Sequence, residues 1–235
     1  MELTCKNLQI YYPQSNTSVI ENLSFSMKNP GFNAAFGPSG VGKTTFARVI
    51  SGLQAPSSGE IETRNIDRIL YTYNLERIPG WSTIKMHIDR VTDSIREPLK
   101  QILIEKFAMK EVMHLRFSQL SMGQQNRINL IRYLLQDFDL LVMDESLANV
   151  DEKLRSEIIL TVKELFPDKM FIYISHHLME VSRFCNEILV FANPSDRQRY
   201  TMVKGLDYKK GNINKPETTI KQLLDTTMLE IMNAF

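Results

Sequence analysis

A glycine-rich loop between an apolar run and a helix-forming segment constrains the fold of this chain more than any other feature. Residues 37–44, Gly-Pro-Ser-Gly-Val-Gly-Lys-Thr, match the phosphate-binding pattern G-x-x-x-x-G-K-[ST]. Residues 32–36 before the loop read as a strand, and residues 44–51 after it read as a helix. Backbone N–H groups of such a loop, and of the helix start that follows, point to one place and favour an anion there. The sequence therefore predicts a strand–loop–helix unit that binds phosphate.

The side chains of this loop supply what a bound phosphate chain needs. Lys43 adds a full positive charge for the outer phosphates, and the Thr44 hydroxyl can take one coordination position of Mg²⁺. The residues expected to contact the nucleotide are Gly37, Pro38, Ser39, Gly40, Val41, Gly42, Lys43, Thr44 and Thr45.

Strand and helix signals alternate along the rest of the chain. Residues 2–12 and 18–28 read as two strands joined by a polar turn at 13–17, which indicates an N-terminal antiparallel β subdomain. The apolar run at residues 140–143 is continuous, as expected of a parallel strand covered on both faces. Residues 171–174 are expected to form another buried strand, and residues 188–192 a short strand. The expected fold class is α/β, a P-loop NTPase core with a mostly parallel sheet.

A helical subdomain is expected to interrupt this strand-rich pattern at about residues 83–136. Residues 83–116 are expected to be helical because apolar residues keep helical spacing on both sides of Pro98. A strong helix is expected from 122 to 136, and a further helix from about 151 to 165 follows the run at 140–143.

The tail, residues 193–235, is expected to be a C-terminal extension that ends in an amphipathic helix. Apolar residues recur there at helical spacing between Ile220 and Phe235. Packing onto the body of the domain is the expected role of this helix, and binding of a partner is the alternative.

Composition narrows the class of protein. The 28 basic and 27 acidic residues leave a net charge of +1, so nothing indicates a nucleic-acid partner. Cys5 and Cys185 are far apart and lack ligand-spaced histidines, which argues against a disulfide scaffold or a zinc site and favours a reducing compartment. No run approaches 18 apolar residues and no signal peptide is visible, so any membrane role is expected to come through a partner.

An acidic pair follows the run at 140–143. Open parallel sheets place ligands at the carboxyl ends of their strands, so Asp144 and Glu145 are expected beside the phosphate-binding loop. Asp144 would hold Mg²⁺, and Glu145 would orient or deprotonate the attacking water. His176 ends the next strand and could hydrogen-bond the γ-phosphate. Helix capping is the alternative role for His176, and His177 is its rival for the phosphate.

A second anion site is predicted at the start of the helix at 122. Residues 120–124, Leu-Ser-Met-Gly-Gln, offer a hydroxyl, a glycine and a helix N-terminus. The P-loop already covers the phosphates bound to its own chain. A second phosphate-binding helix start is useful if it completes the site of another subunit.

These motifs together resemble those of the ATP-binding subunit of an ABC transporter. Residues 120–124 resemble the family signature L-S-G-G-Q, with Met122 at the first glycine. Residues 140–145 resemble the Walker B strand with its catalytic glutamate, and residues 148–151 resemble the D-loop, which ends in Asp151.

The resemblance extends to two more positions. His176 is similar to the switch histidine of the family. Tyr12 is similar to the aromatic residue that stacks on adenine, and Tyr11 is the alternative. In all, residues 1–192 resemble an ABC-type ATP-binding domain, with the motifs in order and sensibly spaced.

The resemblance implies a head-to-tail dimer, formed with a second copy or with a homologous ATP-binding domain. Two ATP molecules with Mg²⁺ would be sandwiched, each between one P-loop and the partner's signature. Closure would move an integral membrane transport subunit, which implies a peripheral position at the cytoplasmic face of the cell membrane. A separate substrate-binding protein is also implied, and nucleic acid is not. The signature residues that would act on the partner's ATP are Ser121, Met122, Gly123 and Gln124.

Three positions depart from the family pattern. Asn74 stands where the Q-loop has glutamine, the position that implies a metal contact and a catalytic role. Asparagine keeps the amide but is one methylene shorter, and a misplacement of about 1 Å can cost on the order of a hundredfold in rate. Ser146 replaces the usual proline after the glutamate, and Gln125 stands where arginine often follows the signature.

The leading function is ATP hydrolysis that powers import through a separate membrane subunit. Residues 73–84, with the only tryptophan of the chain, resemble importers of the nitrate, sulfonate, taurine and thiamine-precursor group. The alternatives are an exporter or lipid-trafficking ATPase, a soluble ABC ATPase of the DNA-repair or translation type, and a regulatory subunit that barely hydrolyses ATP. Leu120 lies only 46 positions after Asn74, and no sustained heptads indicate the long coiled coil of chromosome-type relatives.

Overall fold

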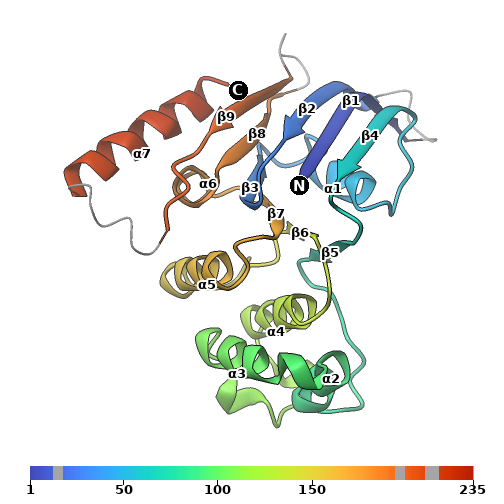
Figure 1. Ribbon diagram of the computed structural model, residues 1–235, viewed down its shortest axis with the longest axis vertical. Helices are drawn as coiled ribbons and strands as arrows, with labels where there is room; N and C mark the ends of the chain where they lie inside the picture. The colour runs from blue at the N-terminus through green and yellow to red at the C-terminus, as the bar shows by residue number, and fades with distance from the viewer. Residues whose placement is uncertain (13–17, 194–198, 210–216, 235) are drawn as a thin grey trace.

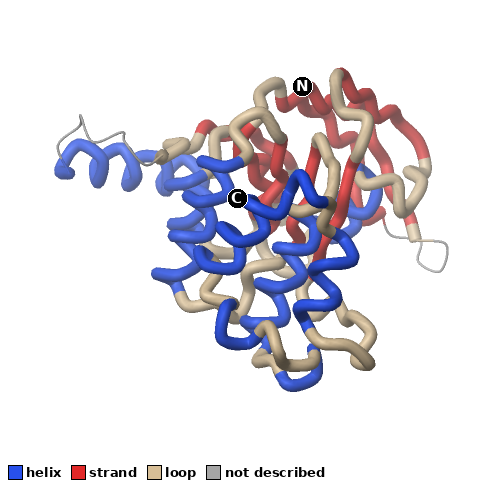
Figure 2. Tube along the Cα trace, turned by 60° about the horizontal axis from the view of Figure 1, so that its bottom comes forward, coloured by secondary structure: helices blue, strands red, loops and turns tan. Residues whose placement is uncertain are grey.

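Two sheets and a group of helices make up the fold (Figure 1). The computed structural model describes residues 1–12, 18–193, 199–209 and 217–234. The turn expected at 13–17 lies outside the described residues. Strands gather in one part of the molecule and most helices in another, as Figure 2 shows.

The N-terminal sheet is antiparallel, as predicted. Its strand order is β2–β1–β4, with β1 at Glu2–Tyr11, β2 at Ser18–Met27 and β4 at Ser58–Arg64. Buried positions of β1 alternate along most of the strand with more exposed ones, and the buried positions include Leu3, Leu8 and Ile10, which are fully buried. They share a core with α1, Lys43–Ile50, so this sheet covers the helix that follows the P-loop.

The central sheet is mostly parallel, which confirms the expected fold class. Its strand order is β5–β6–β7–β3–β8–β9, and the first five strands in that order run parallel. The bounds are β3 Gly31–Phe36, β5 Ile69–Tyr73, β6 Leu140–Asp144, β7 Met170–Ile174, β8 Glu187–Phe191 and β9 Tyr200–Lys204.

Both faces of this sheet are covered. All five residues of β6 are buried, because alternate side chains enter two separate cores. Leu140 and Val142 pack towards α1 and the N-terminal sheet. Leu141 and Met143 pack towards helices α4, α5 and α6. Continuous hydrophobicity of the run at 140–143 is therefore the result of two-sided burial.

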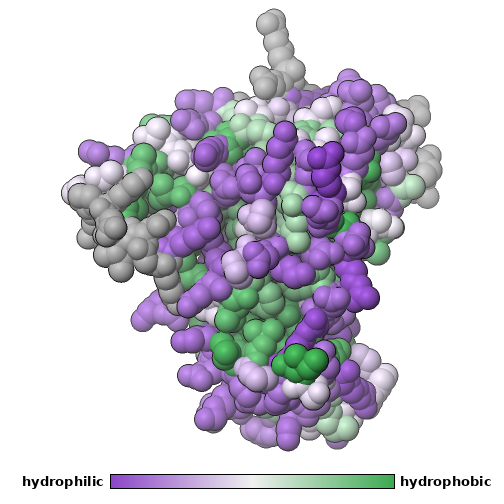
Figure 3. All heavy atoms as spheres, viewed as in Figure 1, coloured by the Kyte–Doolittle hydropathy of each residue, from purple (hydrophilic) through white to green (hydrophobic). Residues whose placement is uncertain are grey.

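The expected helical subdomain is present below the sheet in Figure 1. It contains α2 at Ile84–Val91, α3 at Glu97–Lys106 and α4 at Met122–Leu134, together with short 3₁₀ turns at 94–96, 110–112 and 117–119. Figure 3 shows hydrophobic residues gathered over this lower half of the molecule.

One expectation for this subdomain was wrong, because the helix does not continue to residue 116. It ends at Lys106, and Ala108 adopts a left-handed conformation with φ of 51°. The carbonyl groups left free by this ending accept from Arg127 Nη1, at 2.6 Å for Phe107 and 3.3 Å for Ala108. A long-range arginine therefore stabilises a helix end that local spacing did not reveal.

The C-terminal residues add to the central sheet. Strand β9 pairs antiparallel with β8, from Glu187 opposite Lys204 to Phe191 opposite Tyr200. The sequence did not predict β9, and the boundary expected after residue 192 falls between the two strands of this pair. Parts of the extension, residues 194–198 and 210–216, lie outside the described residues.

The amphipathic helix of the extension is present as α7, Glu217–Met232. It packs against β9 and α6, Leu178–Phe184, and buries Thr227 and Ile231. Ile231 of the apolar stripe therefore packs onto the body of the domain, whereas Leu223 and Met232 of the same stripe are exposed, so partner binding stays the alternative role of this helix. No helix among the described residues combines the length and the hydrophobicity needed to cross a bilayer.

Candidate functional site

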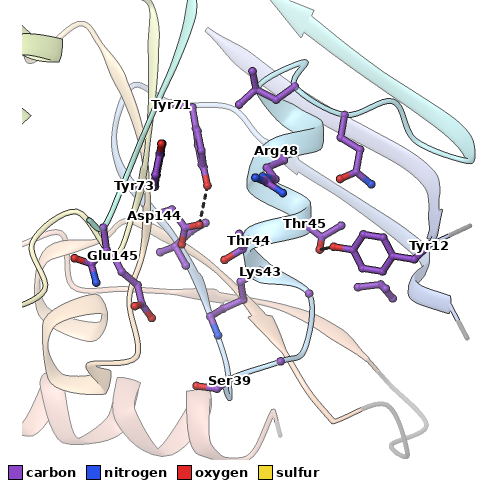
Figure 4. Close-up of a pocket in the computed structure, with 17 residues that line it drawn as sticks. Tyr12, Ser39, Lys43, Thr44, Thr45, Arg48, Tyr71, Tyr73, Asp144 and Glu145 are labelled. Carbon is purple, nitrogen blue, oxygen red and sulfur yellow. Dashed lines mark hydrogen bonds between the residues drawn. The ribbon is translucent and has the colours of Figure 1, made fainter. Parts of the chain in front are cut away.

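A cavity of about 1040 Å³ opens beside the P-loop, between α1, the ends of β5 and β6, and the N-terminal sheet (Figure 4). Seven of the residues predicted to bind nucleotide line it: Tyr12, Ser39, Gly40, Gly42, Lys43, Thr44 and Thr45. Asn74, Asp144 and Glu145 line it as well. Gly37, Pro38 and Val41 are not among its lining residues.

The glycines of the loop are needed for its backbone. Gly37, Gly40 and Gly42 have φ of 154°, 85° and 103°, a region that disfavours other residues. A Cβ at Gly37 would also stand 2.4 Å from the carbonyl oxygen of Phe191. Helix α1 begins directly after Gly42. Its first backbone N–H groups, which have no partner within the helix, therefore lie beside the P-loop.

Lys43 is buried, with 8% of its surface exposed. Its ammonium donates to the carbonyl oxygens of Gly37 at 2.8 Å and Pro38 at 2.6 Å. Burial lowers the pKa of Lys43, and the nearby Glu145 and Asp144 carboxylates oppose that shift. Gly37 and Pro38 therefore take part in the site by holding the lysine rather than by lining the cavity.

Asp144 is the buried carboxylate of the site, with 6% of its surface exposed. Burial raises its pKa, while hydrogen bonds from Thr44 and Tyr71 act in the opposite direction. The Tyr71 hydroxyl donates to Asp144 Oδ2 at 3.0 Å. Burial beside this carboxylate raises the pKa of Tyr71, so its hydroxyl remains a donor. The sequence analysis did not single out Tyr71.

The chemistry of Asp144 and Thr44 suits the binding of Mg²⁺. The carboxylate of Asp144 and the hydroxyl of Thr44 are oxygen ligands, and both line the cavity. Mg²⁺ in nucleotide sites takes one or two protein ligands and completes its shell with phosphate and water. The described residues contain no cluster of three or more His, Cys, Asp and Glu side chains suited to a metal.

Glu145 and the following histidines form a second polar group at the edge of the cavity. Glu145 has a left-handed backbone with φ of 50°, and its N–H donates to the carbonyl oxygen of Ile174. The Oε1 atom of Glu145 lies 3.4 Å from His176 Nδ1. His177 instead occupies the N-cap position of α6, without a side-chain hydrogen bond to the helix, and burial lowers its pKa. His176 is therefore the histidine beside the glutamate, although it is not among the lining residues.

The amide of Asn74 is tied to a residue that the sequence analysis missed. The backbone N–H of Asn74 donates to the backbone carbonyl of Asp144 at 3.0 Å, and the side-chain Oδ1 of Asn74 accepts from Asn126 Nδ2 at 2.9 Å. Asn126 also donates to the carbonyl of Ala148 at 2.7 Å. Asn126 is 2% exposed and links the Asn74 loop, α4 and the D-loop.

Tyr12 lies at the rim of the cavity, opposite the acidic residues in Figure 4. It is 42% exposed, and its hydroxyl lies 2.7 Å from Thr45 Oγ1. Tyr11 is not among the lining residues, and its hydroxyl donates to Gln9 Oε1 at 3.2 Å. Of the two tyrosines, the structure places Tyr12 at the site.

The predicted signature residues form the start of α4. Ser121 Oγ accepts from the Gln124 N–H at 3.3 Å, and Gln124 Oε1 accepts from the Ser121 N–H at 2.9 Å, a capping box. Met122 is 48% exposed. A Cβ on Gly123 would stand 2.3 Å from the carbonyl oxygen of Asn149, so this glycine is required by the D-loop.

The structure does not bring the signature to the P-loop of the same chain. Among the described residues, those that line the cavity include none of Ser121, Met122, Gly123 and Gln124. Asp151 is also outside the lining and caps α5, Glu152–Leu165, by accepting from the Leu154 N–H at 2.9 Å. The start of α4 is therefore a second, separate helix N-terminus with an exposed surface.

Comparison with known proteins gives consistent matches. A family model described as "ABC transporter" matches residues 20–148. The spermidine/putrescine import ATP-binding protein PotA of Legionella pneumophila (strain Paris) is 28% identical over 207 residues, which cover 78% of this chain and 55% of that protein. The Fe(3+) ions import ATP-binding protein FbpC of Vibrio cholerae serotype O1 is 31% identical over 198 residues, covering 75% of this chain and 55% of that protein. The chain spans about half the length of these curated relatives.

Solved structures show the same fold. A dimeric post-hydrolysis state of the ATP-binding cassette MJ0796, bound to ADP and Pi, has a TM-score of 0.71 at 19% identity and covers 86% of this chain and 98% of that one. A bacterial Atm1-family ABC exporter with ATP bound has a TM-score of 0.71 at 21% identity, covering 80% of this chain and 37% of that one.

Proposed function

This chain belongs to the ABC transporter family as an ATP-binding subunit, and we propose that it hydrolyses ATP to power import through a separate membrane subunit. The arrangement of the cavity supports this activity. Lys43 and the loop glycines converge with Asp144 and Glu145 on one space, which is large enough for a nucleotide. ATP and Mg²⁺ are the proposed ligands.

Each residue has a role that its position supports. The P-loop N–H groups and Lys43 bind the phosphates, and Tyr12 at the rim supports the adenine. Thr44 and Asp144 would hold Mg²⁺, with a contact from Asn74, and the metal would supply neutralising charge at the phosphates. Glu145 accepts a proton from the attacking water or orients it. His176 holds Glu145 and donates towards the γ-phosphate.

The observation that carries the proposal is the separation of the two anion-binding helix starts. Among the described residues, those at the start of α4 do not line the cavity of their own chain. A head-to-tail dimer, with a second copy or a homologous ATP-binding domain, would place Ser121, Met122, Gly123 and Gln124 on the partner's ATP. Asp151 would lie at the same interface. ATP drives such closure only through its higher affinity for the closed state.

Import is proposed because the relatives compared above are import proteins by name. The membrane subunit is the proposed partner for the exposed apolar side chains of the helical subdomain, among them Trp81 at 73% and Ile95 at 87% exposure. A separate substrate-binding protein and a peripheral position at the cytoplasmic face of the cell membrane follow from the same proposal. The likeness to the nitrate, sulfonate, taurine and thiamine-precursor group stays a prediction.

The alternatives have less support. The exporter match shows the fold alone, so an exporter or lipid-trafficking ATPase rests on no residue described above. A soluble ABC ATPase of the DNA-repair or translation type would not bind a membrane subunit, so this alternative does not explain the exposed apolar residues of the helical subdomain. A regulatory subunit that barely hydrolyses ATP is favoured only by Asn74.

Two variants test the function. Lys43→Ala should abolish tight ATP binding, because the ammonium is the only full positive charge that the loop contributes. Glu145→Gln should bind ATP normally but accumulate an ATP-bound dimer, seen by size-exclusion chromatography with light scattering. Glu157→Gln, an exposed position on α5, is the control. Full turnover by Glu145→Gln would contradict the proposed role of Glu145, and unchanged ATP affinity in Lys43→Ala would contradict the P-loop site.

A further inference from the structure

The magnesium carboxylate has a partner on the neighbouring strand. Strands β5 and β6 pair in parallel register, with Tyr71 opposite Val142 and Tyr73 opposite Asp144. This register puts Tyr71 and Asp144 on the same face of the sheet. Figure 4 shows the phenol of Tyr71 pointing from β5 towards the carboxylate, where it donates to Oδ2 at 3.0 Å.

The orientation of the phenol is fixed by a second ring. Tyr71 stacks on Tyr73, with ring centroids 5.6 Å apart and planes 22° apart. Tyr73 is 45% exposed, and both tyrosines line the cavity. The hydroxyl of Tyr71 therefore reaches Asp144 from a constrained ring and not from a free surface side chain.

We propose that Tyr71 is a positioning residue for the metal site, an inference that rests on the proposed function. Its hydroxyl holds Oδ2 of Asp144, which leaves Oδ1 as the oxygen for Mg²⁺ or for a water of its shell. A hydrogen bond to one carboxylate oxygen restricts the side-chain rotamer and orients the other oxygen, whereas a carboxylate without that bond samples more orientations. Asp144, 6% exposed, has few other donors to replace the phenol.

The chain offers a matched pair of variants. Tyr71→Phe removes one hydroxyl and keeps the ring, the stack and the packing. Tyr73→Phe removes the hydroxyl of the stacking partner, which donates to no group of Asp144 among the contacts of the described residues. Loss of a hydrogen bond that orients a metal ligand typically costs about ten- to a hundredfold in metal affinity.

The probe is Mn²⁺ in place of Mg²⁺, with its binding to the ATP-loaded protein followed by electron paramagnetic resonance. ATP affinity is measured separately in EDTA. Tyr71→Phe is expected to weaken Mn²⁺ binding by about tenfold or more, with unchanged ATP affinity in EDTA and an unchanged melting temperature. Tyr73→Phe is expected to match wild type in all three measurements.

The possible results test the role of Tyr71 separately from the proposed ATP-binding function. If wild-type protein binds ATP without any dependence on metal, the proposed function fails. If wild type shows metal-dependent binding and Tyr71→Phe binds Mn²⁺ as tightly as Tyr73→Phe, only the role of Tyr71 is overturned. A loss of ATP affinity in EDTA by Tyr71→Phe would also overturn it, because the phenol would then support the cavity in general.

Discussion

Replacement of Gly123 by alanine tests the contact between the start of α4 and the D-loop. A Cβ at this position would stand 2.3 Å from the carbonyl oxygen of Asn149 and 3.2 Å from its carbonyl carbon. Backbone cannot yield as a flexible side chain can. Asn149 already has a left-handed φ of 63°, so the D-loop has little freedom to turn its carbonyl away.

The expected loss of stability and turnover follows from that distance. An ordinary van der Waals contact between a methyl group and a carbonyl oxygen is about 1 Å longer than the 2.3 Å found here, so α4 or the D-loop must move by about that amount. Overpacking of this kind costs about 1–3 kcal/mol of stability. A displacement of about 1 Å in a catalytic element costs on the order of a hundredfold in rate. ATP affinity of the isolated chain should not change, because Gly123 does not line the cavity.

The assay compares turnover, ATP affinity and unfolding by urea in Gly123→Ala and in Gly80→Ala. Gly80 has no heavy atom within 4 Å of the place where its Cβ would stand, so the control adds the same methyl group without a clash. We expect a large fall in kcat only for Gly123→Ala. Wild-type turnover in that variant would refute the reasoning, and equal losses in both variants would show that glycine flexibility matters rather than this contact.

Three further perturbations test the polar contacts. Asn74→Gln should lower kcat by up to about a hundredfold, because the longer side chain displaces the amide from Asn126; wild-type or faster turnover would show that the short amide is a handicap. Glu180→Gln should cost about 3–5 kcal/mol in urea unfolding, since it leaves Arg155, 2.7 Å away and 8% exposed, without its buried partner; a loss within error would contradict this. Burial raises the pKa of Glu76, so the folded state keeps a proton that the unfolded state releases, and stability falls as pH rises from the ordinary carboxyl pKa to the raised one. Glu76→Gln should therefore be more stable than wild type at about pH 7, with the difference shrinking towards about pH 4; a difference independent of pH would contradict the shift.

Local signals were sufficient for much of the fold. The P-loop, the buried strand before Asp144 and the start of the helix after Ser121 all depend on residues within a few positions of one another. Two-sided burial of β6 is visible in the sequence as an unbroken apolar run. These elements were therefore predicted with nearly correct bounds.

Contacts between distant segments could not be predicted in this way. Tyr71 and Asp144 are 73 residues apart, and their contact depends on the register of β5 against β6. Asn126 reaches Asn74 only because α4 packs over the loop after β5. Strand β9 is five residues long and only Val203 is buried, so its pattern resembles that of a loop until β8 pairs with it.

The central claim is that one nucleotide site is built from two chains. The direct measurement is ATP turnover of Lys43→Ala and Ser121→Arg, each alone and then mixed at high concentration. Each variant alone should be inactive, and the mixture should recover activity, because a mixed dimer contains one site with an intact P-loop and an intact signature. Full activity of Ser121→Arg alone, or no recovery in a mixture shown to contain mixed dimers, would contradict the account.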